Sequence, residues 1–297
     1  MTGINIIEKQ LALEDKDKVE SIRKKYNYNT SSHTFASLYI WRKTMGEILC
    51  IGDDFYTVKC ESKGKNAWFF PCGEEQKQKS FVEKSIKNKD FYLCYMRDED
   101  KKFLEENFKN KFLITEIESD NEYIYDREAF EKLEGRKYAA LRNHIRRAER
   151  DNELAVELIS KNKINDVINI IKDWEKLKTE DGSIENTDEI PSIKLIKNFD
   201  ALSVYGIIVK VNEEPFAVVA GFPISEDTFD MCLAKQKSNL SGLSVFAKHQ
   251  FVVNLDKKYK FINAEEDLGI DGLRIMKKQM QPIGQIKMYD GRLLSDD

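Results

Sequence analysis

The most constraining feature of this sequence is an order of apolar patterns that the chain runs through twice. Short apolar or alternating runs predict strands, and longer runs with apolar residues every three or four positions predict amphipathic helices. In both halves the predicted order is β-α-α-β-β-β-α-β-α-β. The fold class that follows is α/β with mixed sheets, built as two similar units.

The predicted elements are spread evenly over the two halves. The first half has predicted strands at 4–7, 47–51, 55–60, 67–71, 91–96 and 112–117, and helices at 15–26, 32–44, 73–87 and 98–108. The second half has strands at 154–159, 203–211, 216–223, 228–235, 259–263 and 285–289, helices at 164–177, 190–202, 244–255 and 272–280, and a polar loop at 179–186. No linker rich in proline, glycine or serine separates the halves, which favours one rigid unit over two tethered modules.

Residues 125–150, between the halves, predict a basic helix with two distinct faces. Its apolar residues recur at helical spacing: Tyr138, Leu141, Ile145 and Ala148. Its arginines lie on an adjacent row: Arg142, Arg146 and Arg150. We therefore expect a first domain at 1–126, a bridging basic helix at 127–150 that presents guanidinium groups to an anionic ligand, and a second domain at 151–297.

The composition excludes several classes of protein. The net charge is −4, so the chain is not coated with basic charge for nucleic acid, although a local basic patch remains compatible with this value. Five widely spaced cysteines and three separated histidines predict neither a disulfide framework nor a metal site. The sequence shows no signal peptide and no apolar run near the ~20 residues that span a bilayer, so we expect a cytoplasmic protein without an integral membrane segment.

Three segments carry a resemblance to a known family: 34–41 (TFASLYIW), 123–150 and 261–282. They resemble the C-terminal domain of phosphatidylglycerol lysyltransferases and their soluble relatives, and the central helix also resembles that of Fem-type peptidyltransferases. The resemblance implies a tandem GNAT acyltransferase fold and the transfer of an amino acid from aminoacyl-tRNA to a lipid or peptidoglycan acceptor. Two positions depart from the family pattern: Ala264 replaces an arginine in the segment 263–269, and Leu141 replaces a basic residue.

An acidic turn follows the predicted strand at 259–263. Glu265, Glu266 and Asp267 lie where the carboxyl end of a strand usually meets a ligand in an α/β sheet. We predict Glu265 and Asp267 as catalytic residues that bind or deprotonate an attacking amine, and Glu266 as a substrate-binding residue. The alternative is a solvated acidic turn in which Asp271 caps the next helix.

Cationic residues on two helices are further candidates for substrate binding. Arg274 and Lys277 share one side of the helix at 272–280 and suit phosphate, the alternative being an ordinary exposed cationic face. Arg142 and Asn143 occupy the family-like Arg-Asn pair of the central helix, where they suit a tRNA acceptor end or a lipid phosphate. Tyr138 is a candidate substrate-binding residue or general acid, and its alternative is a place in the core.

The loop 238–244 precedes the helix at which GNAT enzymes hold the pyrophosphate of CoA on backbone N–H groups. Ser241 and Gly242 are the candidate cofactor-binding residues, but the loop has fewer glycines than the usual motif. The tandem element order and the resemblance to the lysyltransferase family imply an aminoacyl-tRNA donor, an amine or hydroxyl acceptor and no cofactor. We expect the oxyanion to be held by backbone N–H groups at a splayed strand of the second half. The alternatives are acetyl-CoA or another acyl-CoA as donor, and a catalytically inactive tandem GNAT that binds nucleic acid or protein.

Overall fold

The computed structural model describes residues 6–62, 64–180 and 188–294, which form two compact units. The first unit combines the described parts of 1–122, 266–269 and 285–297, and the second combines those of 123–265 and 270–284. This division differs from the predicted domains at 1–126, 127–150 and 151–297, because the chain passes between the units more than once. Residues 4 and 5 of the first predicted strand and most of the predicted loop at 179–186 lie outside the described residues.

The first unit is built on a mixed sheet with strand order β1-β2-β3-β4-β6-β16-β7, in which β5 also pairs with β3. Its elements are β1 (Ile7–Lys9), α1 (Lys16–Lys25), α2 (Phe35–Trp41), β2 (Ile48–Gly52), β3 (Phe55–Ser62), β4 (Lys65–Phe69), β5 (Cys72–Gly73), α3 (Glu75–Ser85), β6 (Tyr92–Met96), α4 (Asp98–Asn107), β7 (Phe112–Glu116) and β16 (Tyr289–Leu293). Strands β4 and β6 are parallel neighbours. Helix α2 begins where the Thr34 hydroxyl accepts a hydrogen bond from the N–H of Ser37, a typical N-cap.

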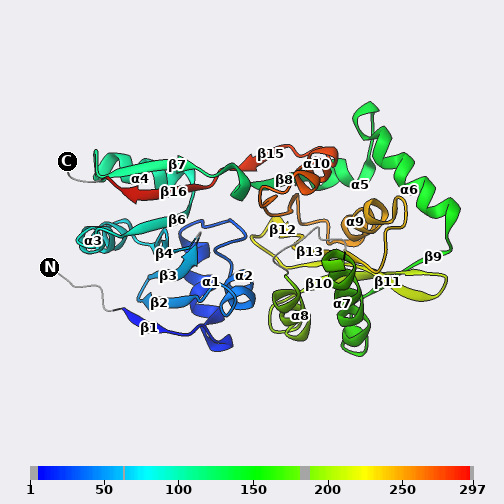
Figure 1. The fold of residues 1–297 in the computed structure, drawn as a ribbon, viewed down its shortest axis with the longest axis horizontal. Coiled ribbons are helices and arrows are strands. Elements are labelled where there is room, and N and C mark those ends of the chain that lie inside the picture. The colour runs from blue at the N-terminus through cyan, green and yellow to red at the C-terminus, as the bar shows by residue number, and fades with distance from the viewer. Residues whose placement is uncertain (1–5, 63, 181–187, 295–297) are drawn as a thin grey trace. The chain divides into compact units, whose positions relative to one another are not determined.

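The strand β16 completes the first unit from the far end of the chain. It runs antiparallel to β6 and β7 and lies between them, as Figure 1 shows by the red arrow beside the cyan-green strands. The hydroxyl of Tyr92 donates to Asp290 over 2.6 Å, and that of Tyr289 donates to Asp98 over 2.7 Å. The prediction of one last strand at 285–289 in the second half is therefore wrong, because 284–286 and 289–293 form two strands and the latter belongs to the first sheet.

The second unit contains two smaller sheets. Its elements are β8 (Glu122–Asp126), α5 (Arg127–Lys132), α6 (Ala139–Asp151), β9 (Leu154–Leu158), α7 (Ile164–Glu180), α8 (Glu189–Lys197), β10 (Tyr205–Val211), β11 (Glu214–Gly221), β12 (Thr228–Asp230), β13 (Leu233–Gln236), α9 (Leu243–Asn254), β14 (Phe261–Asn263) and α10 (Asp271–Gln279). One sheet has the antiparallel order β13-β11-β10-β9, and the other contains β12, β14 and β8. The short strand β15 (Gly284–Ile286) follows where the chain leaves this unit.

The predicted single strand at 228–235 is two strands that belong to different sheets. Strand β12 runs parallel to β14, and the last hydrogen bond of this pair joins the N–H of Met231 to the carbonyl of Asn263 over 2.8 Å. Strand β13 then pairs only with β11 and forms the end of its sheet. The two sheets thus diverge at Met231, and the carboxyl end of β14 lies at the divergence.

The core of the second unit confirms the apolar stripe of the central helix. Tyr138, Leu141, Ile145 and Ala148 are all buried in one hydrophobic cluster that also contains residues of α9. Full burial of a leucine or isoleucine side chain stabilises a fold by roughly 1.5–3 kcal/mol, so this stripe fixes α6 onto α9. The predicted bridging helix is therefore an integral part of the second unit.

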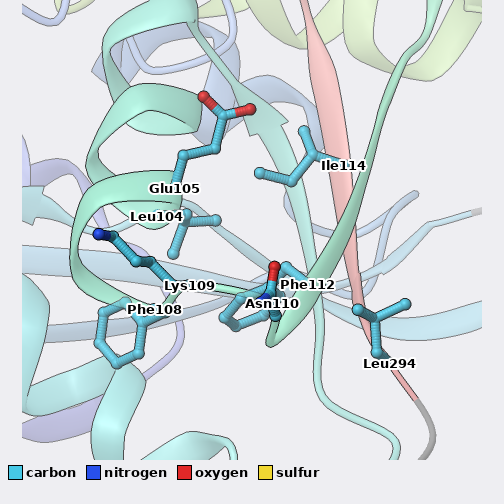
Figure 2. A pocket seen from close by; sticks show the side chains of 8 residues that line it. All are labelled: Leu104, Glu105, Phe108, Lys109, Asn110, Phe112, Ile114 and Leu294. Carbon is cyan, nitrogen blue, oxygen red and sulfur yellow. The ribbon is translucent and has the colours of Figure 1, made fainter.

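A hollow of about 350 Å³ lies in the first unit between α4, β7 and Leu294 (Figure 2). Its lining includes the rings of Phe108 and Phe112, which meet edge to face with centroids 6.2 Å apart. Glu105 and Lys109 supply its charged groups. None of the predicted site residues lines this hollow.

Among the helices that the structure describes, none combines the length and the hydropathy needed to cross a bilayer.

Candidate functional site

Lys277 of α10 is a buried ammonium at the carboxyl end of β14. Its side chain is almost fully covered, with 6% of the residue exposed, and Nζ donates a hydrogen bond to the carbonyl of Ala264, the first residue after β14. The same Nζ lies 5.6 Å from the ring centroid of Tyr123. The hydroxyl of Tyr125 donates to the backbone carbonyl of Lys277 over 2.9 Å. The alternative of an ordinary exposed cationic face is therefore wrong for Lys277, because the Lys277 side of α10 packs toward β8 and β14.

Lys248 of α9 is a second buried amine beside α10. Its Nζ donates to Ser244 Oγ over 2.7 Å and lies 3.6 Å from the sulfur of Met276. Within the described residues it forms no ion pair. Burial, and secondarily repulsion by Lys277, lowers the pKa of Lys248 to about 8. Sequence reasoning missed this residue, although a lysine inside the apolar run of residues 243–253 is the signal that marks it.

The acidic turn after β14 is shared between the two units. Glu265 belongs to the second unit with Lys277 and is half-buried. Its backbone has a φ of +57°, and its N–H donates to the side chain of Asn263 over 2.8 Å. Glu266 and Asp267 belong to the first unit, where Asp267 is buried and accepts the N–H of Gly269 over 2.9 Å. Of the three predicted carboxylates, Glu265 alone therefore lies in the unit of Lys277.

Arg142 serves the local structure of the central segment. Its Nη1 donates to the carbonyl of Leu133 and, over 2.8 Å, to that of Gly135. Leu133 has a φ of +50° at the end of α5, where helix carbonyls lack intrahelical partners. The guanidinium therefore stabilises this turn, while Asn143 is exposed and Tyr138 is buried in the core.

Other basic side chains of the central segment are exposed. Arg136 and Lys137 precede α6, and Arg146 and Arg147 lie on its outer face. Arg150 pairs with Asp151 over 2.7 Å. We call these five exposed residues the basic surface of the second unit. Of the predicted arginine row, Arg142 instead binds the carbonyls of Leu133 and Gly135.

Ser241 and Gly242 pack against α6. Gly242 has a φ of +80°, and a Cβ built on it would lie 2.0 Å from the carbonyl oxygen of His144. Nη1 of Arg147 lies 3.2 Å from Ser241 Oγ and donates to it. The close approach of the two helices accounts for the glycine without a cofactor.

A buried charge cluster supports β13 from the side of α7 and α8. Lys235 Nζ lies 3.1 Å from a carboxylate oxygen of Glu175, 2.5 Å from one of Asp188 and 3.5 Å from the ring centroid of Trp174. Burial raises the pKa of Glu175 although the Lys235 ammonium acts in the opposite direction. The sequence analysis missed this cluster, whose members are far apart in the chain.

The carboxyl end of β6 in the first unit carries an arginine paired with a carboxylate, unlike the carboxyl end of β14, where Lys277 lies. Arg97 follows β6 and binds Asp100 through Nε at 3.0 Å and Nη2 at 2.9 Å. The buried hydroxyl of Tyr28 donates to the same carboxylate over 2.8 Å and accepts from Gln78 over 3.1 Å. This network pairs the charge of Arg97 with that of Asp100.

In the described residues no group of three or more His, Cys, Asp or Glu could hold a metal ion, and all five cysteines are free thiols.

These two α/β units, each with a parallel strand pair, define the class of the protein as a tandem GNAT-type acyltransferase fold. A tandem GNAT protein from the clavulanic acid biosynthesis pathway shares it with a TM-score of 0.50 and 5% identity, over 99% of this chain and 100% of that one. The chain belongs to the family described as phosphatidylglycerol lysyltransferase, C-terminal, which matches residues 23–290.

Two further solved structures are similar over nearly their whole length. A conserved protein of unknown function from Bacteroides thetaiotaomicron VPI-5482 has 27% identity and a TM-score of 0.89, covering 98% of this chain and 100% of that chain. The L-PGS from Bacillus licheniformis has 15% identity and a TM-score of 0.65, covering 96% of this chain and 93% of that one. No curated protein matches by sequence.

Proposed function

We propose that the protein transfers an aminoacyl group from aminoacyl-tRNA to an amine or hydroxyl acceptor. The observation that carries the proposal is the buried side chain of Lys277 at the carboxyl end of β14. This is where the chain leaves β12, which pairs with β14, and continues into β13, which pairs with β11. The family name specifies lysyl transfer to phosphatidylglycerol, which supports an aminoacyl donor and a lipid or peptide-like acceptor.

The reaction begins when the acceptor nitrogen or oxygen attacks the ester carbonyl of the donor. A new C–N or C–O bond forms, and negative charge develops on the carbonyl oxygen. Lys277 and the backbone N–H groups of the diverging strand stabilise this oxyanion, and loss of one such donor typically costs roughly 10²–10³ in kcat. Glu265 binds the acceptor amine and takes its proton, which then passes to the 3′-oxygen of the tRNA as the C–O bond breaks.

The donor is held through its phosphates by the basic surface of the second unit. Arg136, Lys137 and Arg146 are exposed there and suit an anionic backbone, so binding should weaken with salt. Arg274 is half-buried three residues before Lys277 on α10 and is the candidate contact for the terminal phosphate. Arg142 acts indirectly by holding the turn that precedes α6.

The test is incubation of the protein with charged tRNA pools and with amine, peptide and phosphatidylglycerol acceptors. Transfer of label from one aminoacyl-tRNA is expected, and Lys277→Met should reduce it at least about 100-fold. The neighbouring exposed lysine provides the matched control, because Lys278→Met changes the same residue type on the same helix and should retain activity. Absence of transfer from every aminoacyl-tRNA by folded wild-type protein would remove the proposal.

An acyl-CoA donor is the alternative favoured by the 12-residue helix α9, whose first N–H groups follow the loop of Ser241 and Gly242. Its test is thermal stabilisation by acetyl-CoA, since a ligand that binds the native state raises its stability by mass action. A catalytically inactive binding module is the third possibility, motivated by Ala264. It requires Glu265→Ala to function normally in complementation while Arg146→Ala does not.

A further inference from the structure

Ser244 and Lys248 form a hydrogen-bonded pair on successive turns of α9. Nζ of Lys248 lies 2.7 Å from Oγ of Ser244. Lys248 is 6% exposed, so its amine is shielded from water, whereas Ser244 is half-buried. Ser244 is the second residue of a 12-residue helix, where backbone N–H groups point outward without intrahelical partners.

The surroundings of Lys248 do not favour its ammonium form. The charged group that faces it is Lys277 on α10, and its second contact is the sulfur of Met276. No carboxylate pairs with it in the described part of the chain. Because burial lowers its pKa to about 8, roughly one molecule in ten carries a neutral amine at pH 7. An ordinary lysine with a pKa of 10.5 would be neutral in roughly one molecule in 3,000.

We propose that Ser244 is an acylatable nucleophile and that Lys248 is its general base. A nucleophile within hydrogen-bond reach of a base is the arrangement that activates a hydroxyl, and serine–lysine pairs are a known variant of it. The helix N-terminus adds a partial positive charge that stabilises the developing oxyanion. The substrates of this pair are activated carboxylic esters.

The proposed step balances as follows. Neutral Lys248 takes the proton of Ser244 as Oγ bonds to the ester carbonyl carbon, and the bond from that carbon to the leaving oxygen then breaks. The leaving oxygen receives the proton from Lys248, which returns to its neutral form. An amine or hydroxyl acceptor then displaces Oγ from the acyl carbon, and its proton returns through Lys248 to Ser244. This activity is separate from the direct transfer described under the proposed function, in which the acceptor attacks the donor ester itself; the serine–lysine pair acts on activated esters in its own right.

The experiment uses the full chain with p-nitrophenyl acetate as acyl donor and a fluorophosphonate as a stable serine label. We expect a burst of nitrophenolate and label on Ser244, located by peptide mass spectrometry. Ser244→Ala should abolish both signals, and Lys248→Met should slow acylation at least about 100-fold, the usual contribution of general-base catalysis. Ser21→Ala is the matched control, since Ser21 is an exposed helical serine whose hydroxyl donates to the carbonyl of Lys18.

The pH dependence and the tRNA assay separate the possible outcomes. The acylation rate should rise with pH to a midpoint near 8, the pKa of Lys248. Label without transfer from aminoacyl-tRNA supports the serine–lysine pair and counts against the proposed donor. Transfer without label on Ser244 overturns the pair and leaves the donor intact. Equal labelling of wild type and folded Lys248→Met also overturns it.

Discussion

Replacement of Lys248 by methionine should make the protein more stable at neutral pH. The pKa of Lys248 is lowered from 10.5 to about 8, and at 1.36 kcal/mol per unit this difference corresponds to a penalty of about 3 kcal/mol for the charged folded state. Methionine has a similar length and no charge, but it loses the hydrogen bond to Ser244, which contributes about 1 kcal/mol. The expected net gain in the free energy of unfolding is about 2 kcal/mol at pH 7.

The size of this effect on the free energy of unfolding changes with pH in a defined window. Below pH 8 both states of the wild type bind the proton and the penalty is fully present. Between about pH 8 and 10.5 the unfolded chain binds more protons than the folded one, so wild-type stability rises with pH and the advantage of methionine shrinks.

Urea unfolding at pH 7 and at pH 9.5 measures both effects. Lys257→Met is the matched control, because Lys257 is exposed three residues after the end of α9 and its loss should change stability by less than about 0.5 kcal/mol. A Lys248→Met protein that is less stable than wild type at pH 7, or that keeps the same pH dependence, would refute the account of an uncompensated buried ammonium.

Three further substitutions test other contacts by their urea midpoints. Gly242→Ala should lower the free energy of unfolding by at least about 2 kcal/mol, since a left-handed backbone alone costs an alanine about 1–2 kcal/mol and its Cβ would meet the carbonyl of His144. An unchanged urea midpoint contradicts this packing. Asp100→Asn should cost about 3 kcal/mol because it leaves the guanidinium of Arg97 without its counter-charge, and a loss below 1 kcal/mol would count against that ion pair. Glu122→Gln should cost about 1.5–3 kcal/mol, since the buried carboxylate accepts N–H groups from the loop before α2, and a neutral outcome would show those bonds to be dispensable.

The sequence allowed the fold class to be predicted because local periodicity determines most elements. The chain runs from β1 to β7 in the predicted order with only the short β5 added, and α6 buries the predicted stripe. The division between β12 and β13 was missed because Met231 continues the apolar run on both sides of it. Periodicity reports where a strand forms, and the partner of each strand depends on contacts that lie far away in the chain.

The candidate site was less accessible to sequence reasoning. Lys277 was predicted to lie opposite the apolar stripe of its helix, and an exposed face stayed open as the alternative because the sequence does not show what covers that side. Gly242 was predicted as part of a phosphate-binding loop, and its close approach to the carbonyl of His144 could not be predicted from the sequence. Lys248 passed unnoticed, since the energetic cost of a buried amine is apparent only when its neighbours are known.

The insertion of β16 between β6 and β7 has a consequence for how the protein is made. Tyr92 and Asp290, joined by a hydrogen bond, are 198 residues apart in the sequence. Translation at roughly 5–20 residues per second separates their appearance by about 10–40 s. During that interval β6 and β7 have been synthesised without β16, the strand that pairs with both, and their unpaired edges can form incorrect strand pairs. A chaperone that binds nascent chains would therefore have to cover the edges of β6 and β7 until β16 has been synthesised.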